Sequence, residues 1–331
     1  MSVFARAFYV GQPAGRALAF GLTAAATFAP VASAQQAEIP PVIRIIIPFT
    51  PGGSNDLVAR AIANQLGPRL KVTVIAENKP GAAGWIGTKQ VAEAPKDGST
   101  LLSYTLSILT NAATASKPPV DVMKSLVPVS ILTEVPLLVV SSAKSGLRTP
   151  GQIVAAAQAR PGLLTYSSGG AGTIAHLAGE LLQDLAKVEL RHIPYKGGSS
   201  ADLDVVAGHI DMTMGAPATL APLLAAKKLN LVAVTTTQPS PAFPGTPTMA
   251  SAVPGYDASV WTAIWAPAGT PAPLVQRFNQ EMNDIAKTKE FEPLLVGAVR
   301  LELTPAEALD KARRTYATWK EIATKKKIAV D

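Results

Sequence analysis

Residues 43–56, with the sequence IRIIIPFTPGGSND, form the stretch that decides how the rest of the chain is interpreted. An apolar, β-branched run ends in a turn rich in proline and glycine, and apolar residues then recur at helical spacing from Leu57 to Leu66. This order predicts a buried strand, a glycine loop and a helix. Glycine lets a ligand approach the backbone closely, and the first N–H groups of a helix have no partner within it. Because the helix dipole adds about half a positive charge there, such a loop is suited to an anion.

A second stretch of the same kind begins at Leu163. Residues 163–173 read LLTYSSGGAGT, and Ile174, Leu177 and Leu181 follow at helical spacing. The order is again strand, glycine-rich loop and helix. Two such units predict two similar lobes that hold one carboxylate-bearing ligand between them.

The first 34 residues have the pattern of a secretory signal peptide. Arg6 and Arg16 precede an apolar run at residues 18–31, and the small residues at 32–34 form a cleavage site. The run is too short for a membrane anchor, so we expect export with cleavage after Ala34.

Composition narrows the class of protein further. The chain has 331 residues, no cysteine and a formal net charge of +7, which falls to +5 without Arg6 and Arg16. An exported protein without disulfides fits a bacterial periplasm, and a mild basic excess suits anionic ligands. The lysine run at residues 325–327 is not interleaved with aromatic residues, so nucleic acid is not an expected partner. No later stretch is long and apolar enough to span a membrane.

Short apolar strands alternate with helical patterns along the rest of the chain, which predicts an α/β fold of parallel sheets flanked by helices. The run Val127–Val140, interrupted at Pro136, is interpreted as the strand that crosses into the second lobe. The proline-rich residues 239–254 and a strand at Val260–Ala266 would return the chain to the first lobe. We therefore expect lobe one at residues 41–138 and 239–331, and lobe two at residues 139–238.

The second glycine loop also supports an alternative function. Residues 170–175 match the pattern G-x-G-x-x-A, and Glu189 follows at about the distance of a ribose-binding acid, as in a dinucleotide-dependent oxidoreductase. However, Glu189 is expected near the start of its strand, whereas a ribose-binding acid belongs at the end. Export would also separate the protein from the cytosolic nicotinamide pool.

Other catalytic or metal chemistry has little support in the sequence. Ser168 and His176 could act as nucleophile and base, but no G-x-S-x-G turn and no orienting acid accompany them. The three histidines His176, His192 and His209 lack the spacing of metal ligands. We therefore expect no metal, no cofactor and no enzymatic activity. A purely structural exported protein is the remaining alternative.

Six motifs follow one another along the chain: P-F-x-x-G-G-x-x-D at 48–56, E-N-K-P-G-A-x-G-x-I-G at 77–87, D-G-x-T-L-L at 97–102, S-x-G-x-G-T-x-x-H-L-A-G-E at 168–180, P-Y-K-G at 194–197 and A-P-A-G-T-P at 266–271. In this series the chain closely resembles the Bug family, the periplasmic solute-binding receptors of tripartite tricarboxylate transporters. The resemblance covers essentially the whole chain after residue 34.

The resemblance implies a two-lobed periplasmic-binding-protein fold of type II (a Venus flytrap), in which each lobe is a mostly parallel sheet flanked by helices. It implies a small organic carboxylate as the ligand, held in the interlobe cleft by backbone N–H groups, hydroxyls and water. The implied partners are a large and a small membrane permease subunit, although some relatives serve in sensing. We expect the receptor itself to be a monomer.

Three candidate site residues have two interpretations each. Asp56 would compensate the helix dipole, or else would order the first loop or meet a ligand donor, and His176 would order the second loop or touch the ligand, or else would only pack. Trp85 replaces an asparagine that is common in the family and is either a core residue or a wall of the cleft, where it could admit a bulkier acid. Many relatives have an acid near Gly215, and its absence here favours a ligand without an amine. The predicted ligand-binding residues are Phe49, Gly52, Gly53, Ser54, Asp56, Trp85, Ser107, Ser168, Gly170, Ala171, Gly172, Thr173, His176 and Pro217.

Overall fold

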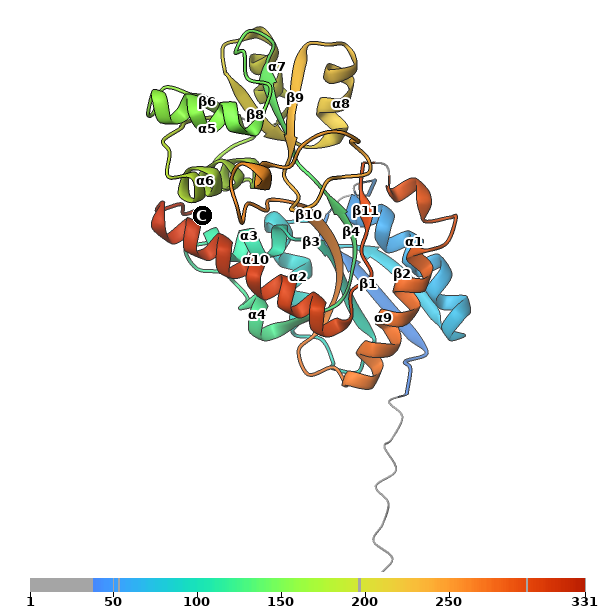
Figure 1. The fold of residues 1–331 in the computed structure, drawn as a ribbon. Helices are drawn as coiled ribbons and strands as arrows, with labels where there is room; N and C mark the ends of the chain where they lie inside the picture. Colours follow the sequence, from blue (N-terminus) through green and yellow to red (C-terminus); the bar gives the residue numbers. More distant parts are fainter. Residues whose placement is uncertain (1–37, 50, 53, 196–197, 296, 331) are drawn as a thin grey trace, which may run out of the picture. The chain divides into compact units, whose positions relative to one another are not determined.

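Two β-sheets organise the part of the chain that the computed structural model describes, namely residues 38–49, 51–52, 54–195, 198–295 and 297–330 (Figure 1). The predicted signal peptide and Gly53 lie outside these residues. In spatial order the first sheet consists of β11 (Val299–Arg300), β4 (Leu126–Val135), β10 (Val260–Pro267), β3 (Thr100–Thr105), β1 (Val42–Ile47) and β2 (Thr73–Asn78). The second sheet consists of β7 (Arg191–Pro194), β6 (Thr165–Ser168), β8 (Met212–Gly215), β5 (Leu138–Ser142) and β9 (Leu229–Val234).

Helices connect the strands of each sheet. The helices that follow strands of the first sheet along the chain are α1 (Ser54–Leu70), η1 (Ala82–Gly84), α2 (Trp85–Ala92), α3 (Ser107–Thr114), α4 (Val122–Ser125), α9 (Ala272–Ala286), η3 (Glu292–Leu295) and α10 (Pro305–Lys325). Those that follow strands of the second sheet are α5 (Pro150–Ala159), α6 (Ile174–Ala186), α7 (Gly198–Ala207), α8 (Pro217–Ala225) and η2 (Met249–Ser251). Both predicted strand–loop–helix units are confirmed, as β1 with α1 and β6 with α6.

Both sheets are mixed, whereas the sequence predicted mostly parallel ones. In the first sheet β1 is parallel to β2 and β3, but β10 is antiparallel to β3 and β4, and β11 is antiparallel to β4. In the second sheet β6 is parallel to β7 and β8, but β5 is antiparallel to β8 and β9. The reason is the path of the chain. Strand β10 returns from the second sheet and so runs opposite to β4, which leaves the first, while β5 enters the second sheet and runs opposite to β9, which leaves it.

The predicted crossing strand is confirmed as two strands with a break at Pro136. Strand β4 ends at Val135 in the first sheet and β5 begins at Leu138 in the second. The return path lies against this crossing, because the N–H of Leu137 donates to Thr235 Oγ1 at 2.7 Å and the N–H of Ala258 donates to the Thr235 carbonyl at 3.1 Å. The two connections between the sheets are therefore joined at Thr235.

The isoleucine run of β1 is buried on both faces of the first sheet. Ile43, Ile45 and Ile47 pack with apolar residues of α1 and α9, whereas Ile46 packs in the cluster that includes residues of α3 and α10. All four side chains have no exposed surface. A central parallel strand that is covered on both faces needs a continuous apolar sequence, which explains why this stretch is so strongly predictive.

Two helices begin with typical N-terminal signals. Thr149 and Thr304 each form a capping box, with Gln152 and Glu307 respectively, and proline follows each threonine at the first helical position. In the described part of the chain, no helix is both long and apolar enough to cross a membrane.

Candidate functional site

The first glycine loop is organised by Asp56, in the first turn of α1. The Asp56 side chain is 3% exposed and accepts from the Arg60 Nε at 3.1 Å, the Gly52 N–H at 3.0 Å and the Asn78 Nδ2 at 2.9 Å. The hydrogen bonds from Arg60, the largest influence, hold the pKa of Asp56 at about 2, although burial acts to raise it. With these partners Asp56 orders the loop, which is one of the two functional roles predicted for it.

Arg60 and Asn78 complete this network and were not among the predicted site residues. Arg60 Nη2 donates to Asn78 Oδ1 at 2.8 Å, and Asn78 Nδ2 donates to the Phe49 carbonyl at 3.0 Å. Arg60 lies four residues after Asp56, which is the helical spacing of an ion pair and could have revealed it. Asn78 has no comparable local signal, because its partners come from another strand and helix.

Phe49 connects this loop to a second, left-handed turn at residues 81–84. Its ring contacts Tyr104 edge-on, with centroids 5.1 Å apart. The Tyr104 O–H donates to the Ala83 carbonyl at 2.7 Å, and Asn111 Nδ2 donates to the same carbonyl at 3.1 Å. Ala83 has φ 51°, and a Cβ at Gly84 would lie 2.4 Å from the Tyr104 oxygen. The backbone is thus held in a conformation that is unfavourable for alanine, next to the first glycine loop.

A cavity of about 720 Å³ lies beside this turn. Trp85 forms part of its wall and is also packed, partly buried, against the apolar core, so its position has a feature of each predicted interpretation. The volume falls in the range of small-molecule sites, and most of the lining is apolar with a few polar groups, as is usual for such sites. Its described lining residues are Ala82, Ala83, Trp85, Asn111, Thr114, Ala115, Ser116, Lys117, Pro119 and Val330.

The second glycine loop is closed by hydrogen bonds among its own residues. The Gly170 N–H donates to Ser168 Oγ at 3.2 Å, and Thr173 Oγ1 donates to the Gly170 carbonyl at 2.7 Å. The Thr173 hydroxyl also accepts from the His176 N–H at 3.4 Å and caps α6. Ser168, Gly170 and Thr173 therefore shape the loop through their side chains and backbone together.

Two stacked imidazoles lie behind this loop. The rings of His176 and His192 are 4.0 Å apart and nearly parallel, and Tyr166 stacks on the other side of His192 at 4.8 Å. His176 Nδ1 accepts from the Gly172 N–H at 3.0 Å, and His192 Nε2 lies 2.7 Å from Ser168 Oγ. Burial lowers the pKa of His176, and burial together with His176 lowers the pKa of His192 to about 4. Both histidines therefore order the loop in their neutral forms, and ordering the loop is among the roles predicted for His176.

The end of the chain packs against this second loop. Lys326 Nζ pairs with Glu180 Oε2 at 2.9 Å, and Lys325 pairs with Asp184, both acids belonging to α6 (Figure 1). Burial acts to raise the pKa of Glu180, but Lys326 and the Tyr166 O–H together hold it below its usual value. These ion pairs join α10, on the first sheet, to a helix of the second.

Val330 lies between the second loop and the 720 Å³ cavity. The Val330 N–H donates to the Thr114 carbonyl at 3.0 Å, and a Cβ at Gly172 would lie 2.5 Å from Val330 Cγ2 and 4.0 Å from Thr114 Oγ1. Val330 and Thr114 both line the cavity, and the first loop reaches the same cavity through Phe49, Tyr104 and Asn111. Each loop is therefore linked to one cavity through the residues that it contacts. The described glycines of the two loops, Gly52, Gly169, Gly170 and Gly172, do not themselves line it.

The backbone N–H groups that remain free for a ligand are not those of the described loop glycines, although the sequence suggests glycine N–H groups as the donors. The N–H groups of Gly52, Gly170 and Gly172 all donate within their own loops. Within the described chain, no acceptor lies in hydrogen-bonding range of the N–H groups of Ala171, Ile174 and Ala175. These donors sit at the start of α6, where the helix dipole favours an anion. This end of the loop can therefore bind a carboxylate oxygen.

Three other predicted site residues each begin a helix, and two of them, Ser107 and Pro217, do not line the 720 Å³ cavity. Ser107 begins α3 directly after β3, and its N–H donates to Thr105 Oγ1 at 3.3 Å. Pro217 begins α8 and is buried, and a Cβ added at Gly297 would lie 3.4 Å from the Pro217 Cβ. Ser54 begins α1, and Gly53 lies outside the described residues.

Asp202 was not predicted as a site residue, and it provides an acid close to Gly215 from another helix. A Cβ at Gly215 would lie 3.4 Å from Asp202 Oδ1. Asp202 is 3% exposed, and its Oδ2 has no partner in the described chain. Burial raises the pKa of this carboxyl group, while a hydrogen bond with Thr219 acts to lower it. Asp202 and Gly215 belong to different elements and are close only in the folded chain. Inspection of the residues next to Gly215 in the sequence therefore did not reveal this acid.

The geometry of Glu189 does not match a ribose-binding acid. Strand β7 begins at Arg191, which pairs with Thr165 at the start of β6, whereas the glycine loop follows Ser168 at the end of β6. Glu189 precedes β7, and a Cβ at Gly162 would lie 3.9 Å from its Oε2. It therefore lies at the opposite end of the strands from the loop. Among the described residues, no group of three or more His, Asp or Glu side chains is arranged to hold a metal ion.

Comparisons with known proteins find matches over most of the chain. A family model described as the tripartite tricarboxylate transporter family receptor matches residues 58–316. Protein BugT of Bordetella pertussis (strain Tohama I) is 34% identical over 250 residues, which are 75% of this chain and 77% of BugT. A solved protein of R. palustris with adipate has a TM-score of 0.67 at 28% identity, covering 87% of this chain and 98% of that one. MatC of Rhodopseudomonas palustris with bound malate has a TM-score of 0.64 at 25% identity, covering 85% and 98%.

Proposed function

This chain belongs to the tripartite tricarboxylate transporter receptor family, and from that premise we propose that it binds a small organic carboxylate in the periplasm. The observation that carries the proposal is the set of unbonded N–H groups at Ala171, Ile174 and Ala175. They lie at a helix start just after Gly172, which is packed against Val330, a residue that lines the cavity of about 720 Å³. An anionic ligand would satisfy donors that the protein leaves without acceptors.

We propose that the ligand lies between two lobes that close on it. Residues 41–138 with 239–331 would form one lobe and residues 139–238 the other. The change of sheet between β4 and β5 and the return before β10 support these boundaries. The ligand would contact the first lobe near Trp85 and Asn111 and the second at the start of α6. Small-angle X-ray scattering should show a smaller radius of gyration with ligand, and an unchanged radius would contradict closure.

The relatives indicate which acids to test first. Adipate and malate are present in the two solved neighbours, and both are dicarboxylates. Micromolar binding requires about 8 kcal/mol, and several charge-assisted hydrogen bonds with burial of an apolar chain can supply this. We expect one such acid to raise the melting temperature and to show saturable heat in calorimetry. The diamide of the same acid is the matched uncharged control and should not bind.

Pairs of ligands test the finer parts of the proposal. Malate and aspartate differ by a hydroxyl and an ammonium group, and the acid that many relatives have near Gly215 is absent from this sequence, while the nearby Asp202 is only 3% exposed. We therefore expect malate to bind more tightly than aspartate. NAD tests the oxidoreductase alternative, and stabilisation by NAD without stabilisation by any carboxylate would overturn the receptor proposal.

We further propose that the protein is a monomer that delivers its ligand to membrane permease subunits after export and cleavage at Ala34. Its family membership supports a transport role and a periplasmic location. N-terminal sequencing of protein recovered from the periplasm tests the cleavage position, and sedimentation tests the monomer. Uptake of the labelled ligand by cells with and without this chain tests delivery, and equal uptake would point to sensing instead.

A further inference from the structure

The side chain of Val330 touches the second glycine loop and also lines the 720 Å³ cavity. In the described chain, the N–H groups of Ala171, Ile174 and Ala175 have no acceptor, and Gly172 lies among them. A Cβ at Gly172 would lie 2.5 Å from Val330 Cγ2, and Val330 is part of the cavity lining. A ligand that is bound to these donors and extends into the cavity must therefore pass the Val330 isopropyl group.

The position of Val330 is fixed by its backbone. Its N–H donates to the Thr114 carbonyl at 3.0 Å, and Val330 forms an isolated parallel β-bridge with Ala115. Just before it, Ile328 packs against the main apolar cluster, and its N–H donates to the Ala323 carbonyl at 2.8 Å. A β-branched side chain also has few rotamers. A ligand therefore cannot displace the isopropyl group without breaking these contacts.

Val330 is an accessible apolar group rather than a core residue. Its side chain is 40% exposed, although its backbone is anchored on two sides. Of the large apolar side chains that are exposed in the described chain, only Val330 lines the 720 Å³ cavity. The isopropyl group can therefore contact a ligand directly.

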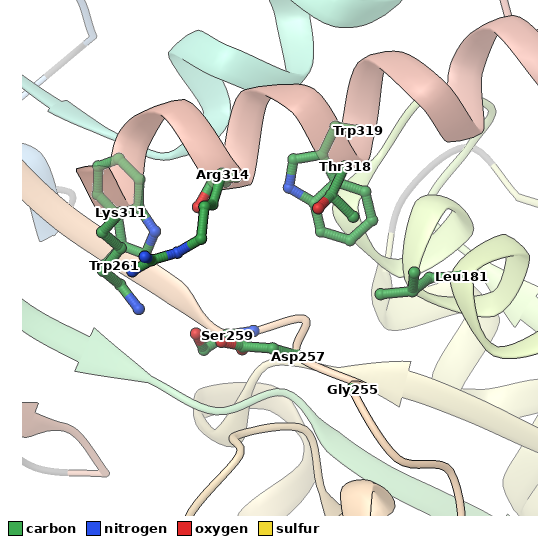
Figure 2. A pocket seen from close by; sticks show the side chains of 10 residues that line it. Leu181, Gly255, Asp257, Ser259, Trp261, Lys311, Arg314, Thr318 and Trp319 are labelled. Atoms are coloured by element: carbon green, nitrogen blue, oxygen red, sulfur yellow. Dashed lines mark hydrogen bonds between the residues drawn. The ribbon is translucent and has the colours of Figure 1, made fainter. Parts of the chain in front are cut away.

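A second cavity, of about 260 Å³, offers a different place for a small acid (Figure 2). Figure 2 shows Lys311, Arg314 and Thr318 of α10 at this cavity, and Val330 is not part of its described lining. Its two cations are already engaged, because Lys311 pairs with Glu134 at 2.8 Å and Arg314 pairs with Asp310. Substitutions at Val330 and at Thr318 therefore distinguish the two cavities.

We propose that Val330 determines which acids the site accepts, by excluding those that are branched at the carbon next to the carboxylate. This inference rests on the proposed function, because it takes the unbonded N–H groups at the start of α6 as the carboxylate-binding donors. A carboxylate on these donors places its neighbouring carbon beside the isopropyl group, where an unbranched CH₂ meets less steric hindrance than a quaternary carbon. In a close-packed apolar site a single methylene group changes discrimination by about 10- to 200-fold.

The test compares adipate with 2,2,5,5-tetramethyladipate, which carries two methyl groups next to each carboxylate and so is branched whichever end is bound. Val330→Ala removes two methyl groups from the protein and matches what the second acid adds at one end. In calorimetry, the parent should bind adipate at least about tenfold more tightly than the branched acid, and Val330→Ala should reduce this ratio about tenfold. Because the ratio compares two acids on one variant, it is insensitive to a general loss of affinity.

Val330→Ile is the opposite change and should raise the ratio. This variant separates a steric role from mere loosening of the segment, which would lower the ratio in both variants. Val42→Ala is the matched control, because Val42 is 39% exposed at the start of β1 and does not line the cavity. Thr318→Ala alters the 260 Å³ cavity instead. Both controls should keep the ratio of the parent.

A single cysteine provides an independent location of the ligand, because the chain has none of its own. The rate of alkylation of a thiol depends on its access to the reagent. Saturating adipate should therefore slow the reaction of Val330→Cys with iodoacetamide and leave the reaction of Val42→Cys unchanged.

The inference and the proposed function fail in different ways. If the parent binds adipate but Val330→Ala keeps its ratio, or if Thr318→Ala changes the ratio as much as Val330→Ala does, the inference is overturned and the receptor proposal stands. Equal alkylation of Val330→Cys with and without adipate would also overturn the inference. If neither acid binds the parent or any Val330 variant, the result contradicts carboxylate binding at these donors and the inference together with it.

Discussion

The stacked pair His176 and His192 makes the stability of this protein depend on pH. His192 lies between the rings of His176 and Tyr166, and its Nε2 lies 2.7 Å from the Ser168 hydroxyl. His176 accepts from the Gly172 N–H at Nδ1 and so cannot carry a proton there. Protonation of both rings would place two positive charges about 4.0 Å apart and would break a bond that closes the second glycine loop.

The sign and size of the effect follow from the pKa of His192. In the unfolded chain a histidine titrates near 6.5, and in the folded protein burial and His176 lower the pKa of His192 to about 4. Between these values the unfolded state binds more protons, so the free energy of unfolding rises with pH across this window and is fully regained above about 6.5. From pH 7.5 to pH 5 this single residue should remove about 2 kcal/mol.

Urea unfolding followed by tryptophan fluorescence at pH 7.5 and pH 5 measures this loss. The variant His192→Gln retains a polar side chain near Ser168 but cannot take up a proton in this range. It should lose about 2 kcal/mol less than the parent between the two pH values, whatever its stability at pH 7.5. His209→Gln is the matched control, because the His209 side chain is 72% exposed. A pH dependence that is equal in the parent and in His192→Gln would refute this account of the buried pair.

Three further substitutions test the loops and the end of the chain. Arg60→Ala should raise the pKa of its buried partner Asp56 from about 2. The protein should then be less stable at pH 7 and should lose less stability between pH 4 and pH 2, as urea unfolding at each pH would show. Gly172→Ala should destabilise by about 1–2 kcal/mol because φ is +77° and the new Cβ meets Val330, and adding Val330→Ala should restore only the steric part in urea unfolding. Lys326→Gln should destabilise by about 2 kcal/mol by leaving the buried Glu180 unpaired, which thermal unfolding would detect.

Each of these three substitutions has a matched control substitution in the same protein. Arg69→Ala removes an arginine that pairs with Glu281 away from the loop, and it should not change the acid region of the stability curve. Lys325→Gln removes the neighbouring, half-exposed lysine and should have a smaller effect than Lys326→Gln, because exposed ion pairs contribute little. Equal losses for the two lysine variants would contradict a special role for the buried pair. If Val330→Ala restored Gly172→Ala completely, backbone strain would not contribute.

Local patterns were sufficient to predict much of the fold. The β-branched run of β1 and the proline break at Pro136 each act over a few residues, and each was found where the sequence placed it. The direction of the strands was not predictable in the same way. Strand β10 and strand β5 are antiparallel to neighbours only because of the order in which the chain visits the two sheets.

Contacts between residues that are far apart in the sequence could not be predicted from the sequence. Asp56 and Arg60 pair within one helix and could be inferred from their spacing, but His192 stacks on His176 from a strand, and Val330 meets Gly172 from the end of the chain. Nothing near His192 or Val330 in the sequence marks either residue as part of a loop. Only the folded arrangement gives these apolar or neutral groups their role.

The glycine loops show why a motif locates a binding site better than it identifies the binding atoms. Glycine at positive φ allows the chain to turn tightly, and the same tight turn brings side-chain acceptors close to the glycine N–H groups. Gly52 donates to Asp56 and Gly172 donates to His176 in this way, so these donors are already occupied. The donors left for an anion are those of Ala171 and the first turn of α6, where no local acceptor reaches. The glycines therefore determine the shape of the loop, and the residues between them and the helix determine what the loop can bind.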